Sequence, residues 1–256
     1  MLVDSHCHIN FPELTGDLDG VLARMRTAGV SHALCVSVSL ETFPEVFAIA
    51  QRFPHIYASV GVHPNERGGV EPTVERLAEL AAHPRVVAIG ETGLDYYRGT
   101  GDLDWQRERF RIHIRAARAC SKPLIIHCRQ AAEDTLRIMK SEEAAKVGGV
   151  MHCFTENLSV AEQAMALGFY ISFSGIVTFN NARDLREVAR AIPLERMLIE
   201  TDSPYLAPAP YRGKTNEPAY VRRVAEQVSE IKEVDFKQVA EVTSANFFSL
   251  FKVKPQ

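Results

Sequence analysis

Two histidines near the N-terminus, His6 and His8, stand one residue apart in a short apolar run that favours a β-strand. Residues two apart on a strand share a face, so both imidazoles can reach one cation while Cys7 points into the packing layer behind the strand. Imidazole is a good ligand for first-row divalent cations. The pair alone also fits an ordinary strand end, so it indicates a metal site only together with further ligands.

Other side chains that bind divalent cations follow apolar runs in the same way. They are His63, Glu91, His127, His152 and Asp202. A carboxylate such as Glu91, placed directly after the apolar segment 86–89, is costly to bury without a cation. Glu200 would share a face with Asp202 in a regular strand, and we choose Asp202 as the ligand because it lies further toward the strand end.

Eight short apolar runs would position these side chains. They begin near Leu2, His32, Tyr57, Val86, Leu124, Gly149, Phe169 and Met197, and their mean spacing of about 28 residues is the length of one strand–helix unit. Amphipathic segments lie between them, for example 18–25, which Gly29 ends. Eight such units predict an α/β fold, a TIM (β/α)8 barrel, as a single domain over residues 1–256. An open doubly wound sheet is the alternative, but no glycine-rich phosphate loop follows any predicted strand.

The composition excludes several classes of protein. The chain has 29 Lys and Arg against 32 Asp and Glu, a formal net charge of -3, so it has no overall attraction to nucleic acid or to an anionic membrane. Its N-terminus lacks a signal-peptide pattern, and no apolar run approaches the roughly 20 residues of a membrane span. The five cysteines are an odd set without C-x-x-C spacing. These features predict a cytoplasmic protein that does not bind membranes and must hold any polyanion locally.

The number of candidate ligands predicts two cations rather than one. His6, His8, Glu91, His127, His152 and Asp202 together exceed what one tetrahedral ion needs. We expect Glu91 to bridge two neighbouring divalent ions, with the first two histidines at one ion and the last two at the other. Two divalent ions with two carboxylates leave a charge of about +2, which suits a hydroxide and an anionic phosphodiester oxygen. Zn, Mn, Mg, Co and Ni all remain possible.

Six segments carry a resemblance to a known family. In chain order they are Asp4-Ser-His-Cys-His, Gly61-Val-His-Pro, Gly90-Glu-Thr-Gly-Leu-Asp, Pro123-Leu-Ile-Ile-His-Cys-Arg, His152-Cys-Phe-Thr and Glu200-Thr-Asp-Ser-Pro-Tyr-Leu. With these segments, which span nearly the whole chain, the sequence resembles the TatD-like metal-dependent hydrolases, barrel enzymes that include DNases. The resemblance implies that one ion is surrounded by His6, His8, Glu91 and Asp202, and the other by Glu91, His127 and His152. Asn10 stands where many members have an acid, which removes no ligand.

The predicted function is that of a metal-dependent deoxyribonuclease that cleaves phosphodiester bonds, with single-stranded DNA as the expected substrate. Glu91 and Asp202 are the expected catalytic residues, and Asp202 would orient or deprotonate the attacking water. His63 is expected to face the substrate rather than to bind metal, and it could donate to a leaving oxygen. The other substrate-binding candidates are Arg129, after the fifth strand, and Tyr205 and Arg212, in the long loop after the eighth. Tyr211, Lys214 and Asn216 lie in the same loop.

Two alternatives remain open. An amidohydrolase-type barrel would use the same metal centre to cleave a C–N bond or a carboxyl ester, including an ester on an aminoacylated RNA. Many such enzymes bridge their metals with a carboxylated lysine on the fourth strand, but here the position is Glu91 and no lysine precedes Lys122. The ester option is therefore the stronger half of this alternative. A non-catalytic barrel with a structural metal would need closed four-coordinate ligation, which six ligands at an open mouth disfavour.

Overall fold

Eight parallel strands follow one another around a barrel in sequence order. The computed structural model describes residues 1–254. Its strands are β1 (Leu2–Cys7), β2 (Val30–Cys35), β3 (Ile56–Val60), β4 (Val86–Asp95), β5 (Leu124–Arg129), β6 (Gly149–Met151), β7 (Phe169–Phe173) and β8 (Met197–Ile199). The sheet closes beyond β8, because Asp202 N donates to His6 O at 2.9 Å and His8 N donates to Ser203 O at 2.7 Å. The predicted α/β fold, a TIM (β/α)8 barrel, is confirmed.

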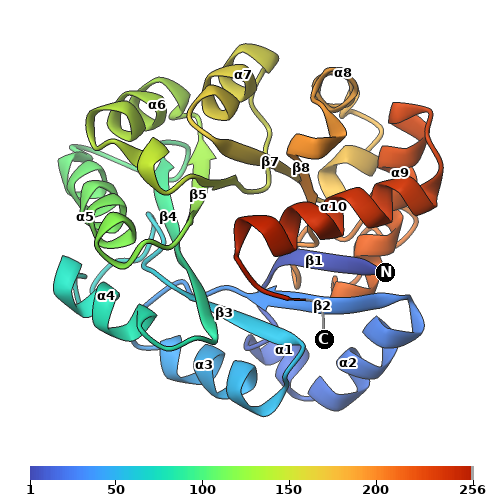
Figure 1. The fold of residues 1–256 in the computed structure, drawn as a ribbon, viewed down its shortest axis with the longest axis horizontal. Helices are drawn as coiled ribbons and strands as arrows, with labels where there is room; N and C mark the ends of the chain where they lie inside the picture. The colour runs from blue at the N-terminus through green and yellow to red at the C-terminus, as the bar shows by residue number, and fades with distance from the viewer. Residues whose placement is uncertain (255–256) are drawn as a thin grey trace.

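Helices surround the strands as an outer ring, apart from the last helix, which crosses one end of the barrel (Figure 1). They are α1 (Pro12–Thr15), α2 (Leu18–Thr27), α3 (Phe43–Arg52), α4 (Val74–Ala81), α5 (Asp104–Cys120), α6 (Ala132–Ser141), α7 (Leu158–Ala166), α8 (Arg183–Ala191), α9 (Val221–Lys232) and α10 (Phe236–Leu250). α2 buries Val21, Leu22 and Met25, the face that the periodicity predicts. Gly29 follows with φ +81°, a left-handed conformation that glycine adopts without steric cost. Across residues 1–254, no helix is both long enough and apolar enough to cross a membrane.

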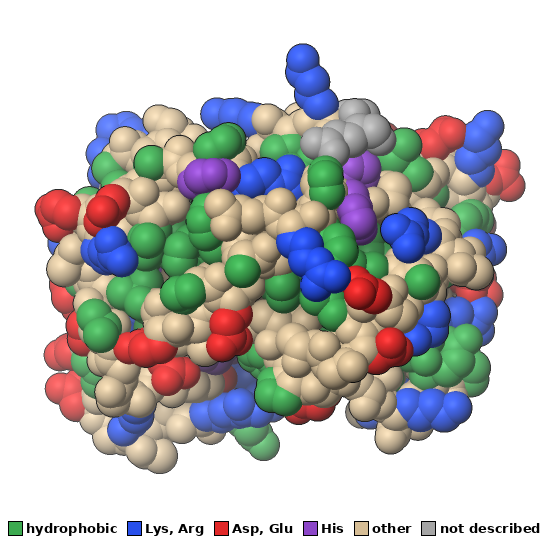
Figure 2. Space-filling view, turned by 90° about the horizontal axis from the view of Figure 1, so that it is seen from below, with side chains coloured by type: hydrophobic (Ala, Val, Ile, Leu, Met, Phe, Trp, Pro, Cys, Tyr) green, Lys and Arg blue, Asp and Glu red, His purple; other side chains and the backbone are tan. Residues whose placement is uncertain are grey.

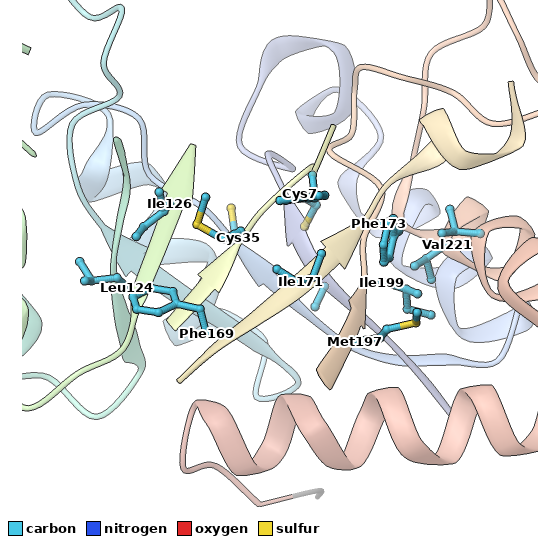
Figure 3. Close-up of a cluster of buried hydrophobic side chains, with 14 of the residues drawn as sticks. Cys7, Cys35, Leu124, Ile126, Phe169, Ile171, Phe173, Met197, Ile199 and Val221 are labelled. Carbon is cyan, nitrogen blue, oxygen red and sulfur yellow. The ribbon is translucent and has the colours of Figure 1, made fainter. Parts of the chain in front are cut away.

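The outer part of the core lies between the strands and the helices. Every second residue of a strand points into it, as Leu124 and Ile126 of β5 and Met197 and Ile199 of β8 do (Figure 3). Cys7 lies in this layer and is fully buried, as expected for the residue between two inward-facing histidines. Because the helices pack against this layer all around the sheet, the strand ends are held at fixed positions.

The inner part of the core fills one end of the barrel. Side chains such as Val3, Val87 and Leu198 meet Phe247 and Phe251 from the region of α10. Figure 1 shows α10 crossing this end of the barrel, near both termini. Since Asn246 Nδ2 donates to Met197 O, the first residue of β8, α10 covers the amino ends of the strands. The carboxyl ends form the opposite rim, which carries the active site in barrels of this kind.

Strand β4 is irregular at the position that matters most for function. Its register against β5 shifts between Ile89 and Thr92. Within this bulge Gly90 has φ +143°, and a Cβ at that residue would lie 2.6 Å from Ile125 O, so only glycine fits. Bulges redirect the neighbouring side chains of a strand. Here the next residue is Glu91, which is turned into the mouth of the barrel.

The face of the molecule shown in Figure 2 gives no sign of a broad anion-binding surface. On the side shown in Figure 2, basic and acidic side chains are intermixed rather than gathered by sign. Many of the surface arginines form ion pairs along the helices, as Arg190 does with Glu187 at 2.6 Å. This pattern agrees with the small net charge and directs attention to the mouth of the barrel.

Candidate metal centre

A cavity of about 960 Å³ opens at the carboxyl ends of the strands. The predicted site residues that line it are His8, His63, Glu91, His127, Arg129, His152, Asp202, Tyr205 and Arg212. His6 lies directly beneath, fully buried, with its Nε2 3.2 Å from Nε2 of His8. The structure therefore brings together the ten residues predicted to bind metal or substrate, from six different strands or the loops that follow them.

Glu91 stands at the centre of this group and is only 3% exposed. Its Oε2 lies 3.4 Å from His6 Nε2 and 3.8 Å from His8 Nε2. Its Oε1 lies 2.8 Å from His152 Nε2 and 3.1 Å from His127 Nδ1. Each oxygen of one carboxylate thus faces different imidazoles, which is the arrangement that a ligand bridging two ions needs.

Asp202 completes the group around His6 and His8. Its Oδ1 lies 3.6 Å from His6 Nε2 and 3.4 Å from His8 Nε2, and the side chain reaches the cavity with 16% of its surface exposed. Glu200 is fully buried instead. It accepts hydrogen bonds from Cys153 N at 2.8 Å and from His152 Nδ1 at 3.1 Å. Asp202 is thus the carboxylate that a cation can reach, and Glu200 supports a histidine from behind.

Hydrogen bonds behind the rings decide which nitrogen faces the centre. His8 Nδ1 lies 3.0 Å from Val36 O, and His152 Nδ1 lies 3.1 Å from Glu200 Oε1. Both oxygens can only accept, so each Nδ1 carries its hydrogen and leaves a lone pair on Nε2 in the neutral ring. Those lone pairs point at the carboxylates in the middle of the group. This orientation is what metal-binding histidines require.

The ring of His127 faces the centre with Nδ1 instead of Nε2. Behind it lies Asp95, which was not among the predicted site residues. His127 Nε2 lies 3.4 Å from Asp95 Oδ2, so Nδ1 faces Glu91. Asp95 is itself fixed by Asn65 Nδ2, which donates at 2.6 Å, and by Arg98 N at 2.9 Å. The only sequence signal for Asp95 was its place at the end of the segment Gly90-Glu-Thr-Gly-Leu-Asp.

His63 differs from these rings. Its Nε2 lies 3.4 Å from Glu91 Oε1, which is within reach of the same metal position as His127. Its Nδ1, however, accepts a hydrogen bond from Asn65 N at 3.0 Å, so Nδ1 is unprotonated and Nε2 carries the hydrogen. Burial lowers the pKa of His63, which keeps the ring neutral. In this state His63 presents a donor, not a lone pair, to the cavity.

The charges inside the group are suited to binding cations. Burial opposes charge on His152, yet Glu91 and Glu200 raise its pKa well above the ordinary value. Burial would likewise raise the pKa of Glu91, but the charges of His152 and His63 and the hydrogen bonds from His127 and His152 hold it well below the ordinary value. His6 Nδ1 is buried without a partner among the described residues. Protonated imidazoles therefore offset the negative charge of the buried carboxylates. Bound metal ions can take over this role.

The remaining candidates lie around the mouth of the cavity. Arg129 stacks on Tyr97, with its Cζ 3.9 Å from the ring centre, and Arg212 stacks on Phe179 at 3.7 Å. Tyr205 is 52% exposed. These three side chains can therefore meet a ligand that enters from solvent.

Two other residues of the loop after β8 are placed differently. Tyr211 stacks on Tyr220 at 4.0 Å and does not line the cavity. Asn216 is fully buried, and its Nδ2 donates to Thr201 O at 2.8 Å. These residues shape the loop, whereas Tyr205 and Arg212 face the cavity.

An eight-stranded barrel with histidines and carboxylates converging at its carboxyl rim defines a metal-dependent hydrolase. The chain belongs to the family of TatD related DNases, whose family model matches residues 3–252. The resemblance drawn from the six sequence segments is thereby confirmed.

Relatives of known name agree with this assignment. The chain is 44% identical to the uncharacterized metal-dependent hydrolase YabD of Bacillus subtilis, over 99% of this chain and 100% of that one. It is 31% identical to the 3'-5' ssDNA/RNA exonuclease TatD of Escherichia fergusonii, over 98% of this chain and 99% of that one. Among solved structures, YJJV, a TatD homolog from Escherichia coli, superposes with a TM-score of 0.91 at 29% identity, covering 99% and 98% of the two chains.

Proposed function

We propose that this hydrolase cleaves phosphodiester bonds in single-stranded DNA with two divalent cations. The observation that carries the proposal is the placement of Glu91, whose two oxygens face different imidazoles. Bound there, the cations would supply an activated water at neutral pH and stabilise the attacking and leaving oxygens. His8 and His152 are already oriented by hydrogen bonds at Nδ1, which supports a role as ligands.

The residues divide into two sets of ligands. One set is His6, His8, Asp202 and the Oε2 of Glu91; the other is His127, His152 and the Oε1 of Glu91. The first set offers four protein ligands and the second offers three, which leaves more room for water and substrate at the second position. The predominance of imidazole favours Zn, Mn, Co or Ni over Mg in affinity.

Two side chains would move protons during the reaction. Burial opposes the charge on Asp202, but the hydrogen bond from His8 and the nearby histidines His6 and His152 hold its pKa below the ordinary value. Asp202 is therefore ionised at neutral pH and able to accept a hydrogen from the attacking water. His63 carries its hydrogen on Nε2 and faces the cavity, so it can donate to the leaving oxygen.

The choice of a nucleic acid as substrate has its own support. The relative from Escherichia fergusonii is named a 3'-5' ssDNA/RNA exonuclease. The cavity combines a metal centre with arginine and aromatic side chains at its mouth, the combination that single strands need. The face shown in Figure 2 has no gathered positive charge, whereas the cavity is lined by Arg98, Arg129 and Arg212, which would hold the polyanion.

The test is to strip the protein of metal and to restore one cation at a time. Activity is then measured on single-stranded DNA, on a phosphomonoester and on an aminoacyl ester. We expect metal-dependent cleavage of the DNA. Cleavage of the aminoacyl ester without nuclease activity would overturn the proposal and favour an ester hydrolase.

A variant at the bridging position makes the test specific. Glu91→Ala is expected to abolish cleavage and to lower the number of bound manganese ions, while circular dichroism shows a folded barrel. Glu91→Gln is the near-isosteric companion. Glu162→Ala, on the exposed face of α7, is the matched control and should behave as the wild type. Full activity in Glu91→Ala would refute the bridge.

A further inference from the structure

Three arginines stand around the mouth of the cavity: Arg98, Arg129 and Arg212. Within residues 1–254, none of them forms an ion pair with an aspartate or a glutamate. Arginines of the outer helices are commonly paired, as Arg115 is with Glu142 at 2.8 Å. The three cations at the mouth are therefore free to meet an anion that comes from outside.

Aromatic rings hold two of these cations in place. Arg129 lies over Tyr97 and Arg212 lies over Phe179, at 3.9 and 3.7 Å from the ring centres. Stacking uses the face of a guanidinium and leaves its N–H edge for other partners. Arg212 Nη1 donates a hydrogen bond to Ala207 O at 3.0 Å, and the other guanidinium nitrogens remain available to a ligand. A planar cation fixed in this way is suited to a phosphate, which it can bind through two parallel hydrogen bonds.

The cations lie on opposite sides of the metal centre. Arg98 follows β4 and Arg129 ends β5, whereas Arg212 lies in the loop after β8. In a barrel with the order β1 to β8, strands β4 and β5 face the segment where β8 meets β1. A phosphate held over Glu91 therefore has an unpaired arginine on either side. One isolated diester would leave these cations without partners.

The charge of the cavity supports the same conclusion. Its lining contains four acidic side chains, Glu66, Glu91, Asp95 and Asp202, against three arginines, which gives -1. Two divalent cations would add four charges and bring the lining to +3. This exceeds what one phosphodiester needs, so the loaded cavity would attract a chain of several phosphates.

Exposed rings complete the rim. Tyr97 is 58% and Tyr205 is 52% exposed, although large apolar surfaces are normally covered. Phe11 lies between the metal centre and the rim, stacked on His8 at 4.9 Å and edge-on to Tyr205 at 6.2 Å. Rings of this kind give the bases of a single strand a surface on which to stack.

We propose that Arg98, Arg129 and Arg212 bind the phosphates that flank the scissile phosphate on its two sides. The site then recognises a single strand of several nucleotides rather than an isolated diester. This inference rests on the proposed phosphodiester cleavage and adds the length and polyanionic character of the substrate.

The test compares the thymidylyl dinucleotide TpT, which has one diester and no flanking phosphate, with a longer oligothymidylate. Arg129→Gln and Arg212→Gln are each expected to lower kcat/KM about tenfold more on the longer strand than on TpT. Each should also reduce the slope of log kcat/KM against log salt by about 0.7, the value for one cation on a single strand. Equal losses on both substrates, or an unchanged slope, would overturn the proposal.

Arg196→Gln is the matched control. Arg196 also stacks on a tyrosine, Tyr170, at 5.6 Å, but it precedes β8 at the amino end of the barrel and does not line the cavity. It should change neither the substrate ratio nor the salt slope. A change as large as that in Arg129→Gln would show a general effect of charge and would count against flanking-phosphate binding.

A binding measurement separates this proposal from the proposed reaction. Fluorescence anisotropy with a labelled phosphorothioate oligothymidylate and manganese does not depend on cleavage. Weaker binding and a smaller salt slope in Arg129→Gln and Arg212→Gln support the flanking contacts even where no substrate is cut. Cleavage of TpT and of longer strands with no difference among the arginine variants leaves the proposed function standing and refutes the flanking contacts.

Discussion

Protonation of His113 is expected to destabilise the barrel as the pH falls below the ordinary range of histidine. The side chain lies on α5 and is fully buried. Its Nδ1 donates to Arg109 O at 2.8 Å, and its Nε2 accepts from Val62 N at 2.9 Å. A second proton would have to enter at Nε2 and would break that bond. Burial accordingly lowers the pKa of His113 from 6.5 to about 4.

The sign and the size of the effect follow from this difference. In the unfolded chain His113 takes up a proton below about pH 6.5, while the folded protein keeps it neutral down to about pH 4. The unfolded state binds more protons, so stability is full above that window and is lost as the pH falls through it. At about 1.4 kcal/mol per pKa unit, the loss is about 2 kcal/mol at pH 5 and about 3 kcal/mol below pH 4.

The measurement is urea denaturation of metal-free protein at about pH 7.5 and about pH 5. Other histidines titrate in the same range, so the result is taken as a difference from His113→Gln. In that variant the amide oxygen can accept from Val62 N, and the side chain does not titrate. Between the two pH values the wild type should lose about 2 kcal/mol more of its unfolding free energy than the variant. Equal losses would refute the assignment of the acid sensitivity to His113.

Two further predictions concern the metal centre. Glu200→Gln should weaken manganese binding about 10- to 100-fold in a calorimetric titration, because His152 loses the carboxylate behind its Nδ1; an affinity like that of Glu162→Gln would contradict this role. His63→Ala should lower kcat on DNA about 100-fold, because the leaving oxygen loses its proton donor. The same variant should lose far less on a p-nitrophenyl diester, whose leaving group needs no proton, and equal losses would exclude donation by His63.

Much of the barrel could be predicted because its local signals are strong. Apolar runs of a few residues, separated by amphipathic segments, place the starts of β1, β4 and β8 at Leu2, Val86 and Met197, as observed. β2 begins at Val30, two residues before the predicted His32, because the polar Ser31 interrupts the run. Ser31 Oγ donates to Leu2 O of the neighbouring strand, a contact between distant parts of the chain that no local pattern reveals.

The geometry of the site was predictable only where the strands are regular. The i, i+2 spacing correctly placed His6 and His8 on one side and Cys7 on the other. At β4 the bulge breaks this alternation, so counting residues along the strand does not give the direction of Glu91. The prediction for Glu91 depended instead on the cost of burying a carboxylate without a cation. Asp95 and Glu200 escaped notice as supports of His127 and His152. Their role depends on distances between strands, which one sequence does not contain.

The structure also separates the proposed metal ligands from His63 by the way each is held. His6, His127 and His152 lie in or directly after strands, where the sheet fixes their backbone. His63 lies in the loop after β3, and two side chains of α5 hold the backbone of that loop. His113 Nε2 accepts from Val62 N, and Arg109 Nη1 donates to His63 O at 3.0 Å. Loss of these α5 contacts would therefore displace His63 before it disturbs the histidines of the strands.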